Sequence, residues 1–117
     1  MLGWKVFGSG VPSLMAAAIC QDTATSVSAA GTTQATATEL TSADSEVTTV
    51  GSGAGVVLSS KLSPGDEQTV FNGGVNPLKV YPTSGMKINS LATNAPMTLG
   101  VNTGVLFKCV STTRVFG

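Results

Sequence analysis

Two pairs of carboxylates are the residues of this sequence best suited to acid–base chemistry. Asp66 and Glu67 are adjacent, and Asp44 and Glu46 are separated by one residue. Neighbouring residues of a strand point to opposite faces, so Asp66 and Glu67 would not converge on one substrate, and Asp66 is better suited to cap the turn that it ends. Asp44 and Glu46 would share a strand face, but the Thr, Ser and Val residues around them would not shape a sugar pocket. We therefore expect neither pair to be catalytic.

The parts of other common active sites are missing. The sequence has no His, so its Ser residues lack an imidazole base and His-based metal ligation is excluded. The glycine-rich stretch 51–55 has no following Lys, which predicts a flexible connection between strands rather than a phosphate-binding loop. Tyr81 either stacks on a glycan or base, or buries its ring to anchor a turn. We expect no enzyme activity, no cofactor and no metal.

Composition and charge narrow the class of protein. The 117 residues fit one domain, in which 42% are hydrophobic but only 5% are aromatic and 10% are charged. Six basic and six acidic residues cancel, whereas binding to nucleic acid needs a basic surplus. No stretch approaches the roughly 20 apolar residues of a membrane-spanning helix. We expect a small β-rich domain with no nucleic-acid, membrane or small-molecule partner.

The charges are unevenly spread along the sequence. The four charged residues that follow Lys5 are all acidic, whereas residues 61–117 carry five basic residues against two acidic ones, a net charge of +3. Either the folded unit has sides of opposite sign, which would favour ordered association between copies, or the charges are simply scattered over its surface.

Residues 1–22 are expected to form an N-terminal arm ahead of a domain at 23–117. Gly8-Ser9-Gly10 predicts a hinge, and Pro12 suits the first turn of one short helix. The single Trp lies in this segment, and an exposed apolar segment typically marks an interaction site. We favour contact with a neighbouring subunit over docking on its own domain, through four residues: Leu2, Trp4, Val6 and Phe7.

Export with a lipid anchor is an alternative for the same segment. The apolar run 14–19 is short for a signal peptide, and Ile19 is bulky for the residue before a lipid-modified cysteine. Cys20 and Cys109 form no metal-binding motif, and are either two buried thiols or a disulfide.

After residue 22 the pattern is β throughout. Turn signals rich in Gly, Asn and Pro recur at intervals of about 8–11 residues, which is typical of an antiparallel sandwich or barrel. We expect a small domain of that kind with about seven to nine short strands. The turns are predicted at Ser63-Pro64-Gly65-Asp66, Asn72-Gly73-Gly74, Thr83-Ser84-Gly85, Asn94-Ala95-Pro96, Asn102-Thr103-Gly104 and Ser111-Thr112-Thr113.

The runs between these turns alternate. Glu67, Thr69 and Phe71 share one face, opposite Gln68 and Val70. The run 105–110 is apolar on both faces except for a Lys, so it should be a central strand or lie at an interface. A core with few aromatic residues is thin, and association would support it, so we expect a homotrimer. Three residues of the run are assigned to the core or the oligomer seam: Leu106, Phe107 and Val110.

The second half of the chain resembles a known family. Leu-Ser-Pro-Gly-Asp-Glu at 62–67, Val-Phe-Asn-Gly-Gly-Val-Asn-Pro-Leu-Lys-Val-Tyr-Pro at 70–82 and Phe-Lys-Cys-Val-Ser-Thr-Thr at 107–113 follow in order. This succession resembles a β-domain of tailed-bacteriophage structural proteins, and is similar to domains of capsid decoration (cement) and head-fibre proteins and to modules of tail proteins. It covers roughly residues 35–117. The family tends to close with an aromatic residue, often Trp, where this sequence has Arg114-Val115-Phe116.

The resemblance implies a structural protein of the virion. We expect a capsid decoration protein on the outer surface of a phage head, which stabilises contacts between major capsid subunits. Leu2, Trp4, Val6 and Phe7 would then contact the shell. The alternative is a tail or fibre component that contacts the host surface.

Overall fold

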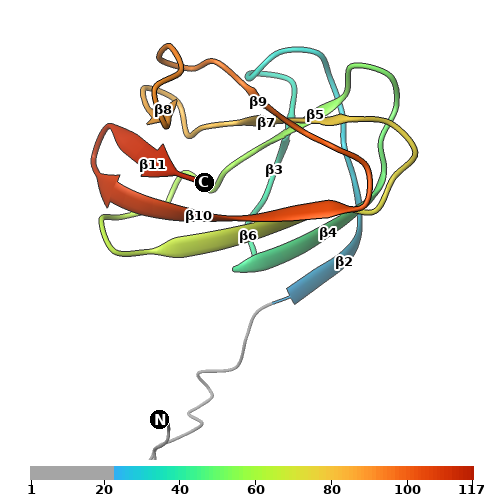
Figure 1. Cartoon of the computed structure of the whole chain (residues 1–117), viewed down its shortest axis with the longest axis horizontal. Coiled ribbons are helices and arrows are strands. Elements are labelled where there is room, and N and C mark those ends of the chain that lie inside the picture. The colour runs from blue at the N-terminus through green and yellow to red at the C-terminus, as the bar shows by residue number, and fades with distance from the viewer. Residues whose placement is uncertain (1–22) are drawn as a thin grey trace, which may run out of the picture.

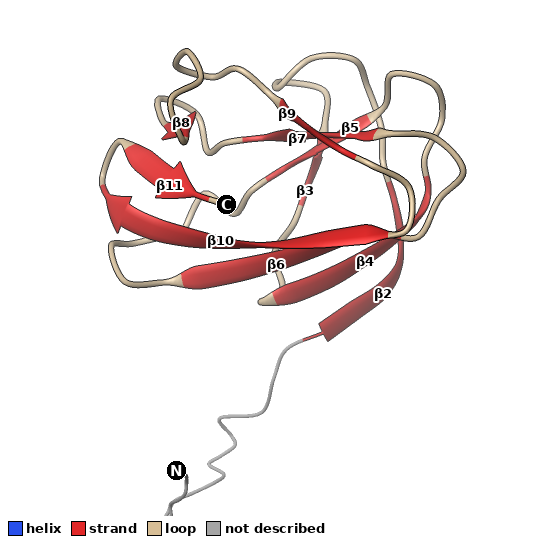
Figure 2. Ribbon diagram, viewed as in Figure 1, coloured by secondary structure: helices blue, strands red, loops and turns tan. Residues whose placement is uncertain are grey.

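A computed structural model describes residues 23–117, which form two facing β-sheets without a helix (Figures 1 and 2). The six-stranded sheet has the spatial order β2 (Thr23–Ser28), β4 (Asp44–Thr49), β6 (Glu67–Asn72), β10 (Thr103–Ser111), β11 (Arg114–Phe116) and β8 (Lys87–Ile88). Its first four strands form the lower layer in Figure 1. The four-stranded sheet has the order β3 (Thr38–Glu39), β5 (Gly55–Val57), β7 (Leu78–Tyr81) and β9 (Met97–Leu99). The all-β prediction is confirmed.

The first half of the described chain winds between the two sheets. Successive strands from β2 to β7 alternate between the layers, with β2, β4 and β6 parallel in one sheet and β3, β5 and β7 parallel in the other. This is a solenoid-like arrangement. Among the strands of residues 23–117, antiparallel pairing is confined to the β6–β10, β10–β11 and β7–β9 pairs, while β11 and β8 are parallel.

The predicted antiparallel sandwich or barrel is therefore wrong in its strand pairing, and the two sheets hold more strands than the seven to nine expected. The physical reason lies at the turns. A turn signal shows where the chain changes direction, but in this chain the turns up to β7 send it to the opposite sheet rather than back along the preceding strand. Parallel neighbours need a long connection, and a strand in the other sheet provides it.

Side-chain alternation builds the core between the sheets. In β6, Gln68 and Val70 are buried, whereas Glu67 and Phe71 are exposed, so these residues divide between the two faces that the sequence predicts. The core is mostly aliphatic, and Phe107 is the one Phe in it among the described residues. Its fully buried members include Val47, Val56, Val70, Leu78, Val80, Ile88, Phe107 and Val115.

The predicted turns supply the backbone conformations that the fold needs. Gly65, Gly85, Asn94 and Asn102 all have positive φ angles, which Gly and Asn adopt at least cost. Asp66 accepts a hydrogen bond from the backbone N–H of Ser63 at 2.9 Å, so it closes its turn as expected.

Ser45 offers a test of the core. Its hydroxyl is buried in β4 and has no hydrogen-bond partner among residues 23–117. A buried polar group without a partner is costly, so Ser45→Ala should raise the free energy of unfolding by about 1 kcal/mol in urea titrations. The exposed Ser28 of β2 provides the matched control, because Ser28→Ala should leave stability unchanged within about 0.5 kcal/mol. A clear loss of stability in Ser45→Ala would contradict the description of the Ser45 hydroxyl as buried without a hydrogen-bond partner.

Candidate binding face

The outward side of the six-stranded sheet carries exposed apolar residues on neighbouring strands. Phe71, Leu106, Val110 and Phe116 are 45–49% exposed. Each alternates with buried neighbours on its strand, so all four point away from the core. We call this surface the outer face; its large or charged residues are Asp44, Glu46, Glu67, Phe71, Leu106, Lys108, Val110, Arg114 and Phe116.

Strand register brings these side chains together. Leu106 pairs with Thr69, and Lys108 pairs with Glu67 on one side and with Phe116 on the other. Phe71 pairs with Gly104, and a Cβ atom at Gly104 would lie only 2.5 Å from Cδ1 of the Phe71 ring. Glycine at this position thus lets the ring lie against the neighbouring strand. The four exposed apolar residues lie on the adjacent strands β6, β10 and β11, with Lys108 among them.

Charge divides the outer face into two halves. The acidic half consists of Asp44 and Glu46 on β4 and Glu67 on β6; the basic half consists of Lys108 on β10 and Arg114 on β11, beside which the register places Lys87 of β8. At their boundary Lys108 Nζ lies 3.4 Å from Glu67 Oε2, the only ion pair within residues 23–117. The guanidinium of Arg114 lies 5.6 Å from the centre of the Phe116 ring, within cation–π range.

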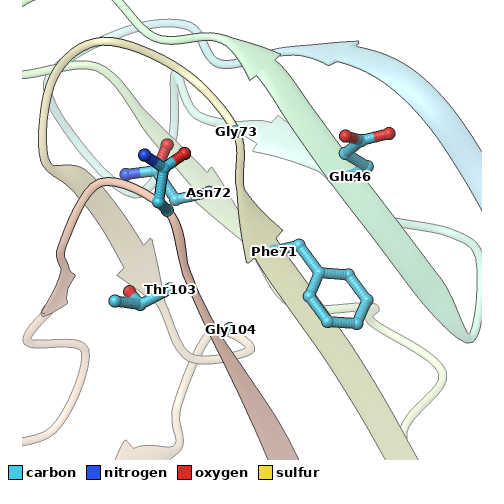
Figure 3. Close-up of a pocket in the computed structure, with 7 residues that line it drawn as sticks. Glu46, Phe71, Asn72, Gly73, Thr103 and Gly104 are labelled. Carbon is cyan, nitrogen blue, oxygen red and sulfur yellow. The ribbon is translucent and has the colours of Figure 1, made fainter.

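A hollow of about 400 Å³ lies between the Phe71 ring and the turn before β10, and Figure 3 shows its lining. Most of its polar groups already serve the fold. The Asn72 amide donates to the carbonyls of Asn76 and Leu99 at 3.0 Å, and the Thr103 hydroxyl donates to the Gly100 carbonyl at 2.6 Å. Of the side chains that line it, Glu46 and Asn102 make no hydrogen bond within the described residues. The hollow is open to solvent.

The residues predicted from the sequence to form sites lie in different parts of the structure. Phe107 lies in the core, whereas Leu106 and Val110 lie on the outer face. Asp44 and Glu46 share that face, as their spacing predicts. Sequence reasoning did not single out Phe71 and Phe116, although the alternation of β6 already placed Phe71 beside Glu67. Leu2, Trp4, Val6 and Phe7, the arm at 1–22 and its possible helix lie outside the described residues.

Other candidate residues have structural roles. Tyr81 is buried, and its hydroxyl donates to the carbonyl of Thr32 at 3.0 Å, so its ring anchors a loop. Cys109 is buried, while Cys20 lies outside the described range. Glu39, on the other sheet, accepts hydrogen bonds from the backbone N–H and hydroxyl of Ser60, which lower the pKa of its carboxyl.

Within residues 23–117, His, Cys, Asp and Glu side chains form no cluster of three that could hold a metal ion. The same residues contain no helix that could cross a membrane. Smaller pockets of about 250 and 230 Å³ lie beside Lys61 and beside Lys79.

Models of known families, curated protein sequences and solved structures give no match to this chain. The family resemblance therefore depends on the sequence motifs, and the outer face on its geometry.

Proposed function

We propose that this protein is a structural component of a phage head, a capsid decoration protein without enzyme activity. The observation that carries the proposal is the outer face, where four large apolar side chains remain nearly half exposed on adjacent strands. Contiguous apolar surface bordered by charges is typical of proteins that assemble with others. The resemblance of residues 35–117 to phage structural domains directs this general role toward the virion.

In this proposal the two apolar regions of the chain have separate tasks. The outer face is the seam of a homotrimer, which supports a domain whose core is small and mostly aliphatic. Residues 1–22 attach the trimer to major capsid subunits, with Trp4 and Phe7 as the aromatic anchors. Binding at a junction of several subunits would stabilise both the shell and the bound domain, because a ligand of the folded state raises its stability by mass action.

One observation favours a second candidate, a tail or fibre component that binds the host surface. The hollow beside Phe71 places an exposed aromatic ring near the carboxylate of Glu46 and the amide of Asn102. An aromatic ring with adjacent polar groups suits a sugar, since the ring covers the apolar side of the sugar and the polar groups bind its hydroxyls.

Co-sedimentation with expanded capsids that lack this protein tests the proposal. We expect saturation at many copies per shell, and a loss of at least tenfold in affinity for a Trp4→Ser, Phe7→Ser double variant. Val75→Ser is the control, because Val75 is the most exposed large apolar residue of the described range and belongs to no proposed contact. Binding of a few copies or none would contradict the decoration role. Binding to host cells or their glycans, lost in Phe71→Ser, would establish the second candidate instead.

A further inference from the structure

The outer face carries charges of both signs, and the two signs lie on different strands. Its acidic residues lie on β4 and β6, its basic residues lie on β10 and β11, and its apolar residues lie on β6, β10 and β11. Across the strands, the charge of the face therefore changes from acidic at β4 to basic at β11. Two copies can therefore bring opposite charges together when one is turned so that its acidic strands lie against the basic strands of the other.

Most of these charges have no partner within the domain. The ion pair between Glu67 and Lys108 is the only one in the described residues, so Asp44, Glu46 and Arg114 have no opposite charge within ion-pair distance there. The Arg114 guanidinium lies near an exposed aromatic ring, which leaves it available to a carboxylate from outside. Charges of both signs thus remain available on the two sides of an apolar patch.

We propose that the outer face binds the outer face of another copy of this chain, with the acidic half of one copy against the basic half of the next. The occupant follows from charge complementarity, since one surface supplies both the carboxylates and the cations. The apolar residues in contact would be Phe71, Leu106, Val110 and Phe116. Opposite charges at the rim fix the orientation of the pair, and burial of the apolar patch supplies most of the affinity.

The pairing deepens the proposed function, because it assigns the seam of the proposed trimer. Around a three-fold axis, the acidic half of each sheet meets the basic half of its neighbour. A two-fold axis that lies in the plane of the face and runs parallel to the strands gives the same contact. The like-charged alternative, acidic half on acidic half, is excluded by repulsion.

Sedimentation velocity of the full-length chain, from micromolar to millimolar concentration, tests the pairing without any capsid. Glu46→Lys and Arg114→Glu should each weaken self-association at least tenfold, because each places like charges in contact. In an equimolar mixture of these two variants, contacts between unlike copies should form again, since the reversed residue of one copy then meets the reversed residue of the other. A ring of three keeps one repulsive contact between like copies, so the mixture should recover mainly as mixed pairs. Lys79→Glu is the matched control: it makes the same charge change as Arg114→Glu, but on β7 of the other sheet.

The outcomes separate the two proposals. A chain that stays monomeric at every concentration, or that associates equally well in all three variants, overturns the pairing but leaves capsid binding to be judged by co-sedimentation. Weakening by the single variants without the formation of mixed pairs in the mixture also overturns it. Folding of each variant is checked by circular dichroism, and all three substituted residues are at least partly exposed, so their replacement leaves the core intact.

Discussion

Replacing Phe107 with alanine should lower the free energy of unfolding by about 3–5 kcal/mol. Phe107 is fully buried, and it is the one Phe of an otherwise aliphatic core in the described chain. Gly117 closes over it, since a Cβ atom at Gly117 would lie 2.5 Å from Cδ1 of the Phe107 ring. The Asn89 side chain holds Gly117 there through hydrogen bonds to its N–H and carbonyl, both at 3.1 Å. Neighbouring atoms can therefore fill only part of the resulting cavity.

Phe116→Ala is the matched control for this prediction. It removes the same side chain from the neighbouring strand, but from the outer face, where Phe116 is nearly half exposed. Below the concentrations at which the chain self-associates, we expect it to cost about 1 kcal/mol or less. Urea unfolding followed by circular dichroism measures both values. Equal losses in the two variants would show that Phe107 does not occupy the core as described.

The second large effect is expected at Gln68, which is buried beneath the connections between the sheets. Its amide group donates to the carbonyls of Leu40 at 2.9 Å and Ser42 at 3.1 Å, and its oxygen accepts from the backbone N–H of Ser59 at 3.0 Å. One side chain thus serves three backbone groups that belong to no strand ladder. Gln68→Leu preserves the approximate volume but leaves these groups unpaired, which should cost about 3 kcal/mol in urea unfolding.

Gln68→Glu separates the hydrogen bonds from the packing. The introduced carboxylate can still accept from Ser59, but it faces the two carbonyl oxygens to which the amide had donated. Burial and these oxygens raise the pKa of the introduced carboxyl in the folded state above its unfolded value of about 4.3. The contribution of this carboxyl to the free energy of unfolding is therefore most favourable below about pH 4, and it is lost as the pH rises through the raised pKa. The loss of unfolding free energy caused by Gln68→Glu should therefore be smaller near pH 4 than near pH 7. An equal loss at both pH values would contradict the described contacts.

The sequence predicted the β content, the turn positions and which residues of β6 share a face, because these depend on local alternation and on residues that tolerate positive φ. It did not predict the pairing of the strands. The turn signal Asn72-Gly73-Gly74, for example, is equally compatible with a hairpin and with the crossing that it makes to the other sheet. That choice depends on how layers distant in the sequence pack, and no local pattern records it.

The candidate face was only partly accessible to sequence reasoning. Leu106 and Val110 were assigned to the core or to a seam, because a strand that is apolar on both sides fits either location. The division into acidic and basic halves could be suspected from the uneven charges, but its position on one sheet follows from β4 and β10 lying on opposite sides of β6. The position of the Phe71 ring could not be predicted from the sequence, because it depends on the pairing of Phe71 with Gly104 of β10.

The winding of the chain between the two sheets also affects how the protein can fold. From β2 to β7 no strand pairs with the strand that follows it, and each ladder joins strands separated by a strand of the opposite sheet. The β10–β11 hairpin is the only ladder between consecutive strands in the described chain. Ladders between distant strands must close long loops before they gain any hydrogen bonds, which slows folding. During synthesis, therefore, the strands that emerge first have no partner within reach until a full coil has followed them.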